Sequence, residues 1–349
     1  MATPGATNGI TDVDGVTVGH HERIGAGWAT GTTVVLTPHG AVCGVDGRGG
    51  APGTRETDLL APQNLVQRVH GICLSGGSAY GLAAADGVMR WLGEHQYGFA
   101  VGSHPHEVVP IVPAAVIFDL PSGEWGNHPD AEFGYRACHD AGTGPVRQGS
   151  VGAGAGAVTG SLKGGVGTAS AVLPPAEDAE PVTLGALAVV NARGESVDRA
   201  TGTPWAADAE LVGEFGVSSW PGRPARDGAA GQASLNTIVG VVATDAALRK
   251  AECQRLAMAA QDGIARAVRP AHSMFDGDTV FALSTGHREL PDADTPIGLP
   301  ARAGAFDRLC AEAATTFSRA IVRGVLAAEG HAVVPAYRDV WPEAFPPER

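Results

Sequence analysis

The sequence predicts an α/β protein in which β-sheets pack face to face and helices cover the outside. Through most of the first two-thirds of the chain, short apolar runs alternate with turns rich in glycine and proline, as strands do. A strongly β-forming segment begins at residue 237, and two long helical segments follow it near the C-terminus. Many strands with few helices favour sheet packed on sheet, with helices outside.

The predicted strands are short runs rich in β-branched and other apolar residues. They cover residues 16–19, 32–37, 41–46, 71–74, 110–120, a pair of strands within 152–172, then 183–191 with a return at 194–197, 237–244 and 279–284. The run at 110–120 has little polar content, so we expect it to be internal.

Apolar positions at helical spacing predict three helices, at residues 80–92, 246–268 and 306–328. Pro270 ends the second, and Gly330 stops the third. Residues 121–149 are polar and irregular, which is typical of a long functional loop. The sequence has no internal repeat and no clean linker, so we expect residues 1–349 to form one domain.

Composition excludes several classes of protein. The formal net charge of −13 argues against non-specific binding to nucleic acid or to an anionic membrane. Fifty glycines and only 5% aromatics favour closely packed backbones with many tight turns. The five cysteines are odd in number and lack a CxxC, so we expect no disulfide framework or zinc ribbon. Most of them lie in apolar runs, where cysteine is a small buried hydrophobe.

Residues 1–8 carry no positive cluster and no apolar region, so they do not predict a signal peptide. No apolar run approaches the roughly 20 residues that a membrane helix needs. We therefore expect a cytoplasmic location.

The dipeptide Asn236-Thr237 is the first candidate for chemistry. Residues 199–232 are rich in proline, glycine and charge, and they run directly into the strand at 237. By residue preference alone, Asn236 is an ordinary turn residue and Thr237 is the first residue of a strand. A threonine hydroxyl becomes a useful nucleophile when a base lies within hydrogen-bond reach, and the α-amine of an N-terminal threonine is such a base. Thr237 gains that amine only if the bond to Asn236 is cut.

Two carboxylates, Asp276 and Asp278, lie two residues apart on extended backbone, which places them on one side of the strand. Asp-Gly is also a common turn signal. As a functional pair, they would orient a hydroxyl and an ammonium and share protons.

Lys163 and Lys250 are the only lysines in the chain. Lys250 lies at the charged start of a helix, where we expect it to face solvent. Lys163 lies in a glycine-rich, buried-looking segment, where a compact ammonium has a tunable pKa; a surface hairpin lysine is the alternative. Asn191 ends an apolar strand and is either an ordinary turn residue or an amide for a developing oxyanion.

At this point the residues resemble a known family. Asn236-Thr237-Ile238 followed by Val-Val-Ala-Thr-Asp at 241–245 is similar to the self-cleavage site of the DmpA-type L-aminopeptidase/D-esterases, which are autoprocessing hydrolases with an N-terminal nucleophile. Further similar segments are GVTVGH at 15–20, VDGRGG at 45–50, LSGGSAYGL at 74–82, PAAVIFD at 113–119 and DGDT at 276–279. The similarity covers roughly residues 10–330 in consistent order.

Within this family the chain looks closest to the 6-aminohexanoate-oligomer (nylon-oligomer) endohydrolases. The resemblance implies Thr237 as nucleophile, with Lys163, Asn191, Asp276 and Asp278 as the other catalytic residues. The aminopeptidase members have a Ser/Glu pair where this chain has the two aspartates. Phe118 replaces a tyrosine that contacts the oxyanion in some members, which leaves the second oxyanion donor open.

The resemblance also implies the fold and the assembly. The fold is a four-layer αββα sandwich, DmpA- or ornithine-acetyltransferase-like, cut into an α chain of residues 1–236 and a β chain of residues 237–349. The assembly is a homo-oligomer, typically a tetramer of αβ units. No metal or organic cofactor is implied.

The expected mechanism begins with attack of the Thr237 hydroxyl on the Asn236 carbonyl, giving an ester that water hydrolyses. The mature enzyme then attacks the amide of a small peptide or oligoamide, or an ester. The proton acceptor is either the Thr237 amine or Lys163. Asn191 and backbone N–H groups hold the oxyanion, while the two aspartates position Thr237 and balance the charge of Lys163.

Other activities stay open as alternatives. An aminopeptidase or esterase that releases N-terminal residues fits the same site, and so does an acyltransferase. A serine hydrolase would use Ser161 with Lys163, and a binding protein would hold an anion on the SGGS segment at 75–78. A metal site would use the histidines at 20–21 or at 104 and 106. Exo-cleavage needs a carboxylate that captures the substrate amine, for which Glu124, Asp130 and Glu132 are candidates.

Overall fold

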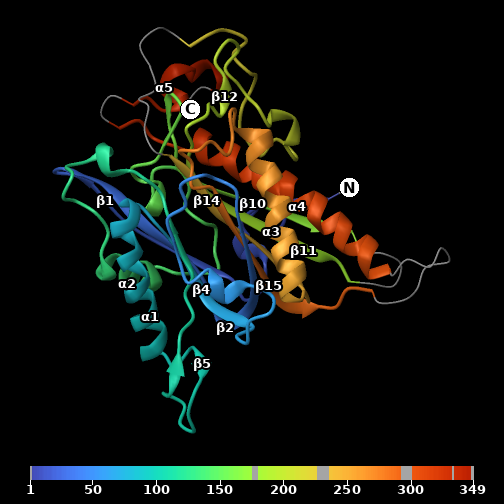
Figure 1. Ribbon diagram of the computed structural model, residues 1–349. Helices are drawn as coiled ribbons and strands as arrows, with labels where there is room; N and C mark the ends of the chain where they lie inside the picture. The colour runs from blue at the N-terminus through green and yellow to red at the C-terminus, as the bar shows by residue number, and fades with distance from the viewer. Residues whose placement is uncertain (1, 175–179, 226–235, 292–300, 332–333, 347–349) are drawn as a thin grey trace.

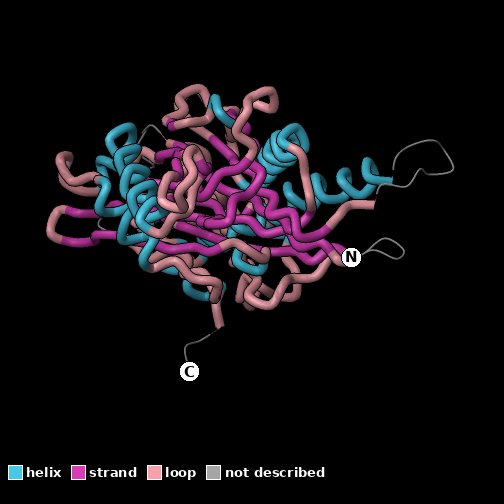
Figure 2. Tube along the Cα trace, turned by 90° about the horizontal axis from the view of Figure 1, so that it is seen from below, coloured by secondary structure: helices cyan, strands magenta, loops and turns pink. Residues whose placement is uncertain are grey.

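A computed structural model describes residues 2–174, 180–225, 236–291, 301–331 and 334–346. The strands run side by side through the middle of the molecule, and helices lie outside them (Figure 2). The helices α3 (Lys250–Ala267) and α4 (Ala301–Leu326) cover one side, and α1 (Ala84–Glu94) with α2 (Ala131–His139) covers the other (Figure 1). The predicted layered α/β sandwich is therefore confirmed.

Nine strands form one continuous sheet: eight follow the order β10-β11-β14-β15-β2-β4-β7-β3, and β1 pairs with the first part of β2. Their bounds are β1 Thr17–Gly25, β2 Trp28–Gly47, β3 Thr54–Arg55, β4 Arg68–Ser75, β7 Ala114–Val116, β10 Val166–Leu173, β11 Val182–Asn191, β14 Thr237–Ala246 and β15 Thr279–Arg288. Three hairpins are separate: β5 (Phe99–Ala100) with β6 (Val108–Val109), β8 (Val158–Thr159) with β9 (Leu162–Lys163), and β12 (Val197–Asp198) with β13 (Thr203–Pro204). Helix α5 (Tyr337–Val340) is short.

The long strand β2 links the two halves of the sheet. Its first part pairs with β1 and β4, and its last part pairs with β15. The pairing with β4 shifts register between Leu36 and Ala41. The two short strands predicted at 32–37 and 41–46 are thus parts of one strand, and an irregular pairing accounts for the break in the sequence pattern.

Alternation along the strands places side chains in three apolar clusters, because successive strand residues point to opposite faces. Val242 packs in the cluster beneath α3 and α4, while its neighbour Val241 packs in a central cluster that also holds residues of β4. Val34 packs against α1, and its neighbour Val35 lies in the central cluster. The central cluster therefore lies between the two halves of the sheet, which gives the four layers αββα.

Three element predictions differ from the structure. The return strand predicted at 194–197 is only an isolated bridge from Glu195 to Arg269 and the first residue of β12. Residues 110–120 form only the three-residue strand β7, Ala114–Val116. Residues 121–149, predicted as a long loop, contain α2. The Asp130 carboxylate accepts hydrogen bonds from Glu132 N and Phe133 N at the start of α2, and Phe133 and Ala137 face inward one turn apart. This N-cap is enough to begin a nine-residue helix in a polar segment.

The cysteines are all free, and Cys43, Cys73, Cys138 and Cys253 are buried, as the sequence predicts. Lys250, predicted to face solvent, is 4% exposed. That prediction is wrong because its ammonium donates to three carbonyls of the neighbouring loop, those of Leu59, Asn64 and Val66. Within the described ranges, no helix is long and apolar enough to cross a membrane.

A buried ion pair joins α4 to the rest of the fold. Arg319 and Glu214 have side chains that are 0% and 5% exposed, and two hydrogen bonds of 2.5 and 2.8 Å connect them. Removing one partner from such a pair costs about 3–5 kcal/mol, because it leaves an uncompensated buried charge. Glu214→Gln should therefore lower the free energy of unfolding by about that amount in urea melts.

The control is Glu132→Gln, which breaks an ion pair with Arg136 between side chains that are 48% and 58% exposed. This change should move the urea midpoint far less. Equal midpoints for the two variants would contradict a structural role for the buried pair.

Candidate active site

Three neighbouring strands bring four of the five predicted catalytic residues together at one end of the sheet, and Lys163 lies on a separate hairpin. Asn191, the last residue of β11, lies directly opposite Thr237, the first residue of β14, in the antiparallel register. β15 runs parallel to β14, and the Asn236 and Asp276 backbones form a parallel bridge just before both strands begin. Adjacent strand ends thus collect residues that are distant in the sequence, and Asn236, Thr237, Asn191 and Asp276 are at most 5% exposed.

The Thr237 hydroxyl lies against the carbonyl of the preceding residue. Its Oγ1 donates to Asn236 O at 2.5 Å. The Gly277 N–H lies 3.1 Å from Thr237 Oγ1 and 3.1 Å from Asn236 O. A Cβ on residue 277 would come within 2.9 Å of Thr237 Oγ1 and 2.6 Å of Ala51 O. Only glycine fits between the two aspartates, and its N–H is aimed at the atoms that would react.

The two carboxylates hold the backbone around Thr237. Asp278 Oδ1 accepts from Ile238 N at 2.8 Å, and Asp278 Oδ2 accepts from His272 N at 3.2 Å and lies 2.8 Å from His272 Nδ1. Asp276 accepts from Arg193 N at 3.2 Å and from Ser273 N at 2.8 Å. Both side chains are 2% exposed. They fix the positions of Ile238, of the loop before β15 and of the residues that follow β11.

The Asn191 amide bridges two backbone segments. Its oxygen accepts from Val158 N at 2.9 Å, and its nitrogen donates to Phe118 O at 3.3 Å. The backbone carbonyl of Phe118 therefore takes part in holding the Asn191 amide. The Phe118 ring lies 6.5 Å from the ring of the exposed Trp125.

Lys163 is 1% exposed and lies opposite Val158 in the β8–β9 hairpin. Its ammonium donates to Gly154 O and Gly164 O, both at 2.8 Å. Burial lowers the pKa of Lys163 to about 7, and the negative charge of Asp119 acts in the opposite direction. The carboxylate that influences Lys163 is thus that of Asp119, not those of Asp276 and Asp278.

Asp119 is a buried carboxylate that sequence reasoning missed as a site residue. It is 3% exposed, and its Oδ1 accepts from Gly77 N at 2.6 Å. Burial raises its pKa to about 6, although the hydrogen bond from Gly77 and the charge of Lys163 lower it. A Cβ on Gly76 would come within 2.2 Å of both Asp119 Oδ2 and Thr30 Oγ1, so this glycine is required for the carboxylate to be seated.

Two alternatives from the sequence do not match the geometry. Ser161 Oγ donates to Glu195 at 3.1 Å, whereas Lys163 donates to backbone carbonyls, so the two do not form a nucleophile–base pair. In the SGGS segment, the Gly77 N–H already binds the Asp119 carboxylate. The anion expected at this helix start is therefore supplied by the chain itself.

The histidines proposed as metal ligands have other contacts. Within the described part of the chain, no group of three or more His, Cys, Asp or Glu side chains could hold a metal ion. His20 is buried, and its Nδ1 lies 2.9 Å from Thr33 Oγ1. His104 and His106 stack on each other in an exposed loop.

The carboxylates proposed to capture a substrate amine are mostly engaged around α2. Asp130 caps this helix, and Glu132 pairs with Arg136 and Arg90 at the surface. Glu124 donates its backbone N–H to Gly27 O in the turn between β1 and β2. No described hydrogen bond links any of the three to Thr237.

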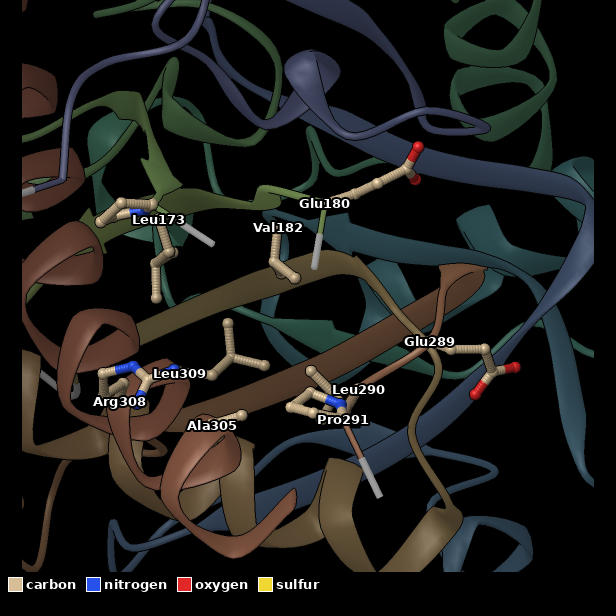
Figure 3. Close-up of a pocket in the computed structure, with 10 residues that line it drawn as sticks. Leu173, Glu180, Val182, Glu289, Leu290, Pro291, Ala305, Arg308 and Leu309 are labelled. Atoms are coloured by element: carbon tan, nitrogen blue, oxygen red, sulfur yellow. The ribbon is translucent and has the colours of Figure 1, made fainter. Parts of the chain in front are cut away.

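One pocket lies at the opposite end of the same strands (Figure 3). Leu173 and Val182 from the β10–β11 hairpin, Leu290 after β15, and Leu309 of α4 line it. Because Val182 and Asn191 are the two ends of β11, this pocket is separate from the Thr237 cluster. Two further cavities of about 220 and 290 Å³ also lack the five predicted catalytic residues.

Known proteins resemble this chain over most of its length. The model of "Peptidase family S58" matches residues 8–335. An uncharacterized aminopeptidase of Mycobacterium tuberculosis is 54% identical over 354 residues, covering 97% of this chain and 99% of the relative. The 6-aminohexanoate-oligomer endohydrolase of Paenarthrobacter ureafaciens is 32% identical over 296 residues, covering 80% of this chain and 76% of that protein.

Solved structures show the same fold. A Burkholderia sp. beta-aminopeptidase aligns with a TM-score of 0.70 at 28% identity, covering 99% of this chain and 96% of the other. The L-aminopeptidase D-Ala-esterase/amidase of Ochrobactrum anthropi, described as a variant of the Ntn hydrolase fold, aligns with a TM-score of 0.72 at 23% identity, covering 98% and 96%. The resemblance to the DmpA-type family is thereby confirmed. The chain belongs to peptidase family S58 and is a hydrolase of amide or peptide bonds.

Proposed function

We propose that this protein is an autoprocessing N-terminal-threonine amidohydrolase. It cuts its own Asn236–Thr237 bond, and the exposed Thr237 then cleaves amide bonds of small peptides or oligoamides through an acyl-enzyme. One observation carries the proposal: the Thr237 hydroxyl lies 2.5 Å from the Asn236 carbonyl oxygen, and the Gly277 N–H is directed at that same oxygen from 3.1 Å. A nucleophile and an oxyanion donor meet at one peptide bond.

Self-cleavage follows as an N-to-O acyl shift. Thr237 Oγ1 bonds to the Asn236 carbonyl carbon, the carbon–nitrogen bond breaks, and the hydroxyl proton passes to the nitrogen, which becomes the Thr237 amine. The Gly277 N–H stabilises the oxyanion that forms on Asn236 O. Water then hydrolyses the ester and releases an α chain ending at Asn236 from a β chain that begins at Thr237.

Turnover repeats the chemistry on a substrate. Thr237 Oγ1 attacks the substrate carbonyl, and either the Thr237 amine or Lys163 accepts the proton and passes it to the leaving amine. Asp278 holds Ile238, the residue after the nucleophile, through a 2.8 Å hydrogen bond. Asn191 is the proposed second oxyanion donor, since this residue lies opposite Thr237 in the antiparallel register.

A second candidate is an aminopeptidase that releases N-terminal residues. The relative with 54% identity carries the name aminopeptidase, whereas the named endohydrolase shares 32%. Both candidates use the same nucleophile, and they differ in whether the substrate needs a free amine. Acetylated and free dipeptide amides, assayed side by side, distinguish them: an aminopeptidase hydrolyses only the free form.

The cleavage step is tested on a denaturing gel of the purified protein. Two fragments of roughly two-thirds and one-third of the chain are expected, and N-terminal sequencing of the smaller should begin at Thr237. A single intact band from a preparation that still hydrolyses amides would contradict the proposal.

The pH dependence identifies the proton acceptor. If Lys163 is the acceptor, kcat should rise with pH through about 7, because burial lowers its pKa to about 7 and only the neutral amine accepts a proton. The Asp119 charge raises that pKa, so Asp119→Asn should move the rising limb to lower pH. If the Thr237 amine is the acceptor, the limb should lie near ~8 and respond less to this change.

Asp245→Asn provides the matched control for this profile. Asp245 is also buried and binds a backbone N–H, that of Thr183, but it lies at the far end of β14. Its replacement should leave the rising limb in place. An equal shift in both variants would show that the effect is not specific to the Asp119–Lys163 pair.

A further inference from the structure

Self-cleavage and turnover share one chemical intermediate. The N-to-O shift leaves the asparaginyl group of residue 236 esterified to Thr237 Oγ1. An asparaginyl amide attacked by the mature enzyme gives the same ester, with the same carbon–oxygen bond to be hydrolysed. Since water must cleave this ester during maturation, the site that surrounds Asn236 is able to hold an acyl group in a reactive position.

The structure shows how Asn236 is held. The residue is 4% exposed. Its side-chain nitrogen donates to Ala192 O at 2.8 Å and to Val158 O at 3.3 Å. Its backbone nitrogen donates to Phe275 O at 3.2 Å, and its carbonyl accepts from Gly277 N. Backbone carbonyls thus accept hydrogen bonds from both the side-chain amide of Asn236 and its backbone N–H.

These carbonyls belong to the same elements that carry the proposed catalytic groups. Ala192 follows Asn191, and Val158 donates its N–H to the Asn191 amide oxygen at 2.9 Å. Phe275 and Gly277 flank Asp276. Recognition of the acyl group is therefore coupled through rigid backbone to the groups that act on its carbonyl, and no movement of a long side chain is needed.

We propose that the position occupied by Asn236 is the acyl subsite of the mature enzyme, and that it selects acyl groups bearing a short primary carboxamide and an N–H on the α-carbon. This inference rests on the proposed function and names its substrate class: asparaginyl amides and peptides with asparagine on the acyl side of the cut bond. Departure of the new Asn236 carboxylate from the subsite opens it to substrate.

The reaction on such a substrate is balanced. Thr237 Oγ1 bonds to the asparaginyl carbonyl carbon as the carbon–nitrogen bond breaks, and the hydroxyl proton reaches the leaving amine through the proposed base. Water then adds to the ester, the carbon–oxygen bond breaks, and free asparagine or an asparagine-terminated peptide is released with Thr237 restored. No other reactant takes part.

Carbonyl acceptors discriminate strongly between similar side chains. An aspartate carboxylate has no hydrogen to donate and would set negative oxygens against Ala192 O and Val158 O. A leucine side chain has similar size but leaves the Val158 carbonyl without the donor it has in the structure. Sites built on hydrogen bonds reject analogues that lack them far better than apolar pockets reject a change in size.

The experiment measures kcat/KM of the cleaved enzyme for the p-nitroanilides of asparagine, aspartate and leucine. Asparagine should exceed leucine by at least about tenfold and aspartate by at least about 100-fold. If the leucine or aspartate anilide is hydrolysed as fast as the asparagine anilide, the subsite assignment is overturned while the proposed function stands. If cleaved protein hydrolyses none of the three nor any other amide, the proposed function fails and the inference with it.

A second measurement compares the same side chains within the precursor. Asn236→Leu and Asn236→Asp should slow self-cleavage in the order found for the anilides, with aspartate slower. This comparison uses the chain as its own substrate, and circular dichroism checks that each variant is folded. A matching order in the two assays supports a shared subsite. If side chains at residue 236 change the self-cleavage rate but the anilides are hydrolysed equally, the subsite acts in self-cleavage and not in turnover. The inference is then wrong.

Discussion

Replacing Thr237 with alanine should leave a folded, uncut and inactive protein. The hydroxyl is the only part of the side chain with a role in the proposed chemistry, and the change removes the group that attacks both the Asn236 carbonyl and the substrate. Loss of a nucleophile that acts with its base as a unit reduces kcat by at least about 10³-fold. Thr237→Ser, which keeps a hydroxyl, should still be cut. A denaturing gel and an amidase assay on the same preparations measure both effects.

Thr244→Ala is the matched control for this prediction. Thr244 lies on the same strand, is fully buried and donates its hydroxyl to Thr183 O at 2.8 Å, but it lies at the opposite end of β14. This variant should be cut and active. Turnover by Thr237→Ala close to that of the unaltered protein would place the nucleophile elsewhere.

Gly277→Ala should abolish self-cleavage and amidase activity nearly as completely. The added Cβ would lie 2.9 Å from Thr237 Oγ1 and 2.6 Å from Ala51 O, closer than such atoms approach in proteins. The loop must shift, and with it the N–H that faces Asn236 O. Loss of one oxyanion donor alone costs about 3 kcal/mol in the barrier, or roughly 10²–10³-fold in rate. The cleavage half-time and the kcat of any cleaved fraction measure this loss.

The control for Gly277→Ala is Gly304→Ala in α4. An added Cβ there meets no atom within 4 Å, so the change should leave cleavage and activity unaltered. Alanine in an exposed helix position is also favoured over glycine by about 1 kcal/mol. Normal cleavage by Gly277→Ala would show that its N–H plays no part in the reaction.

The sequence predicts the main strands well because their side chains follow strong local rules. The run after Thr237 is mostly β-branched and apolar, and β14 forms there with every residue buried. The helices at 246–268 and 306–328 agree with α3 and α4 within a few residues at each end. Periodicity cannot show how distant strands join, so the continuity of β2 between the two sheet halves is visible only in the structure.

Parts of the site depend on contacts that no local pattern encodes. Asp119 ends the family-like PAAVIFD segment, but no pattern predicts its place beside Lys163, which arises from burial and from the Gly77 N–H. Gly277 was visible only as a spacer between two aspartates, although its N–H faces Thr237. Lys250 was misread because its carbonyl partners come from a loop almost 200 residues earlier. Residues 226–232, the last part of the proline- and glycine-rich stretch before Asn236, lie outside the described ranges.

The most direct test of the central claim is to trap the acyl-enzyme. Cleaved protein is mixed with a slowly hydrolysed ester or amide, quenched in acid, and its fragments are weighed by mass spectrometry and sequenced. The account predicts that the fragment beginning at Thr237 gains the mass of the acyl group, attached to the Thr237 side chain. An acyl group found instead on Ser161 or any other residue, while Thr237 stays unmodified during turnover, would contradict it.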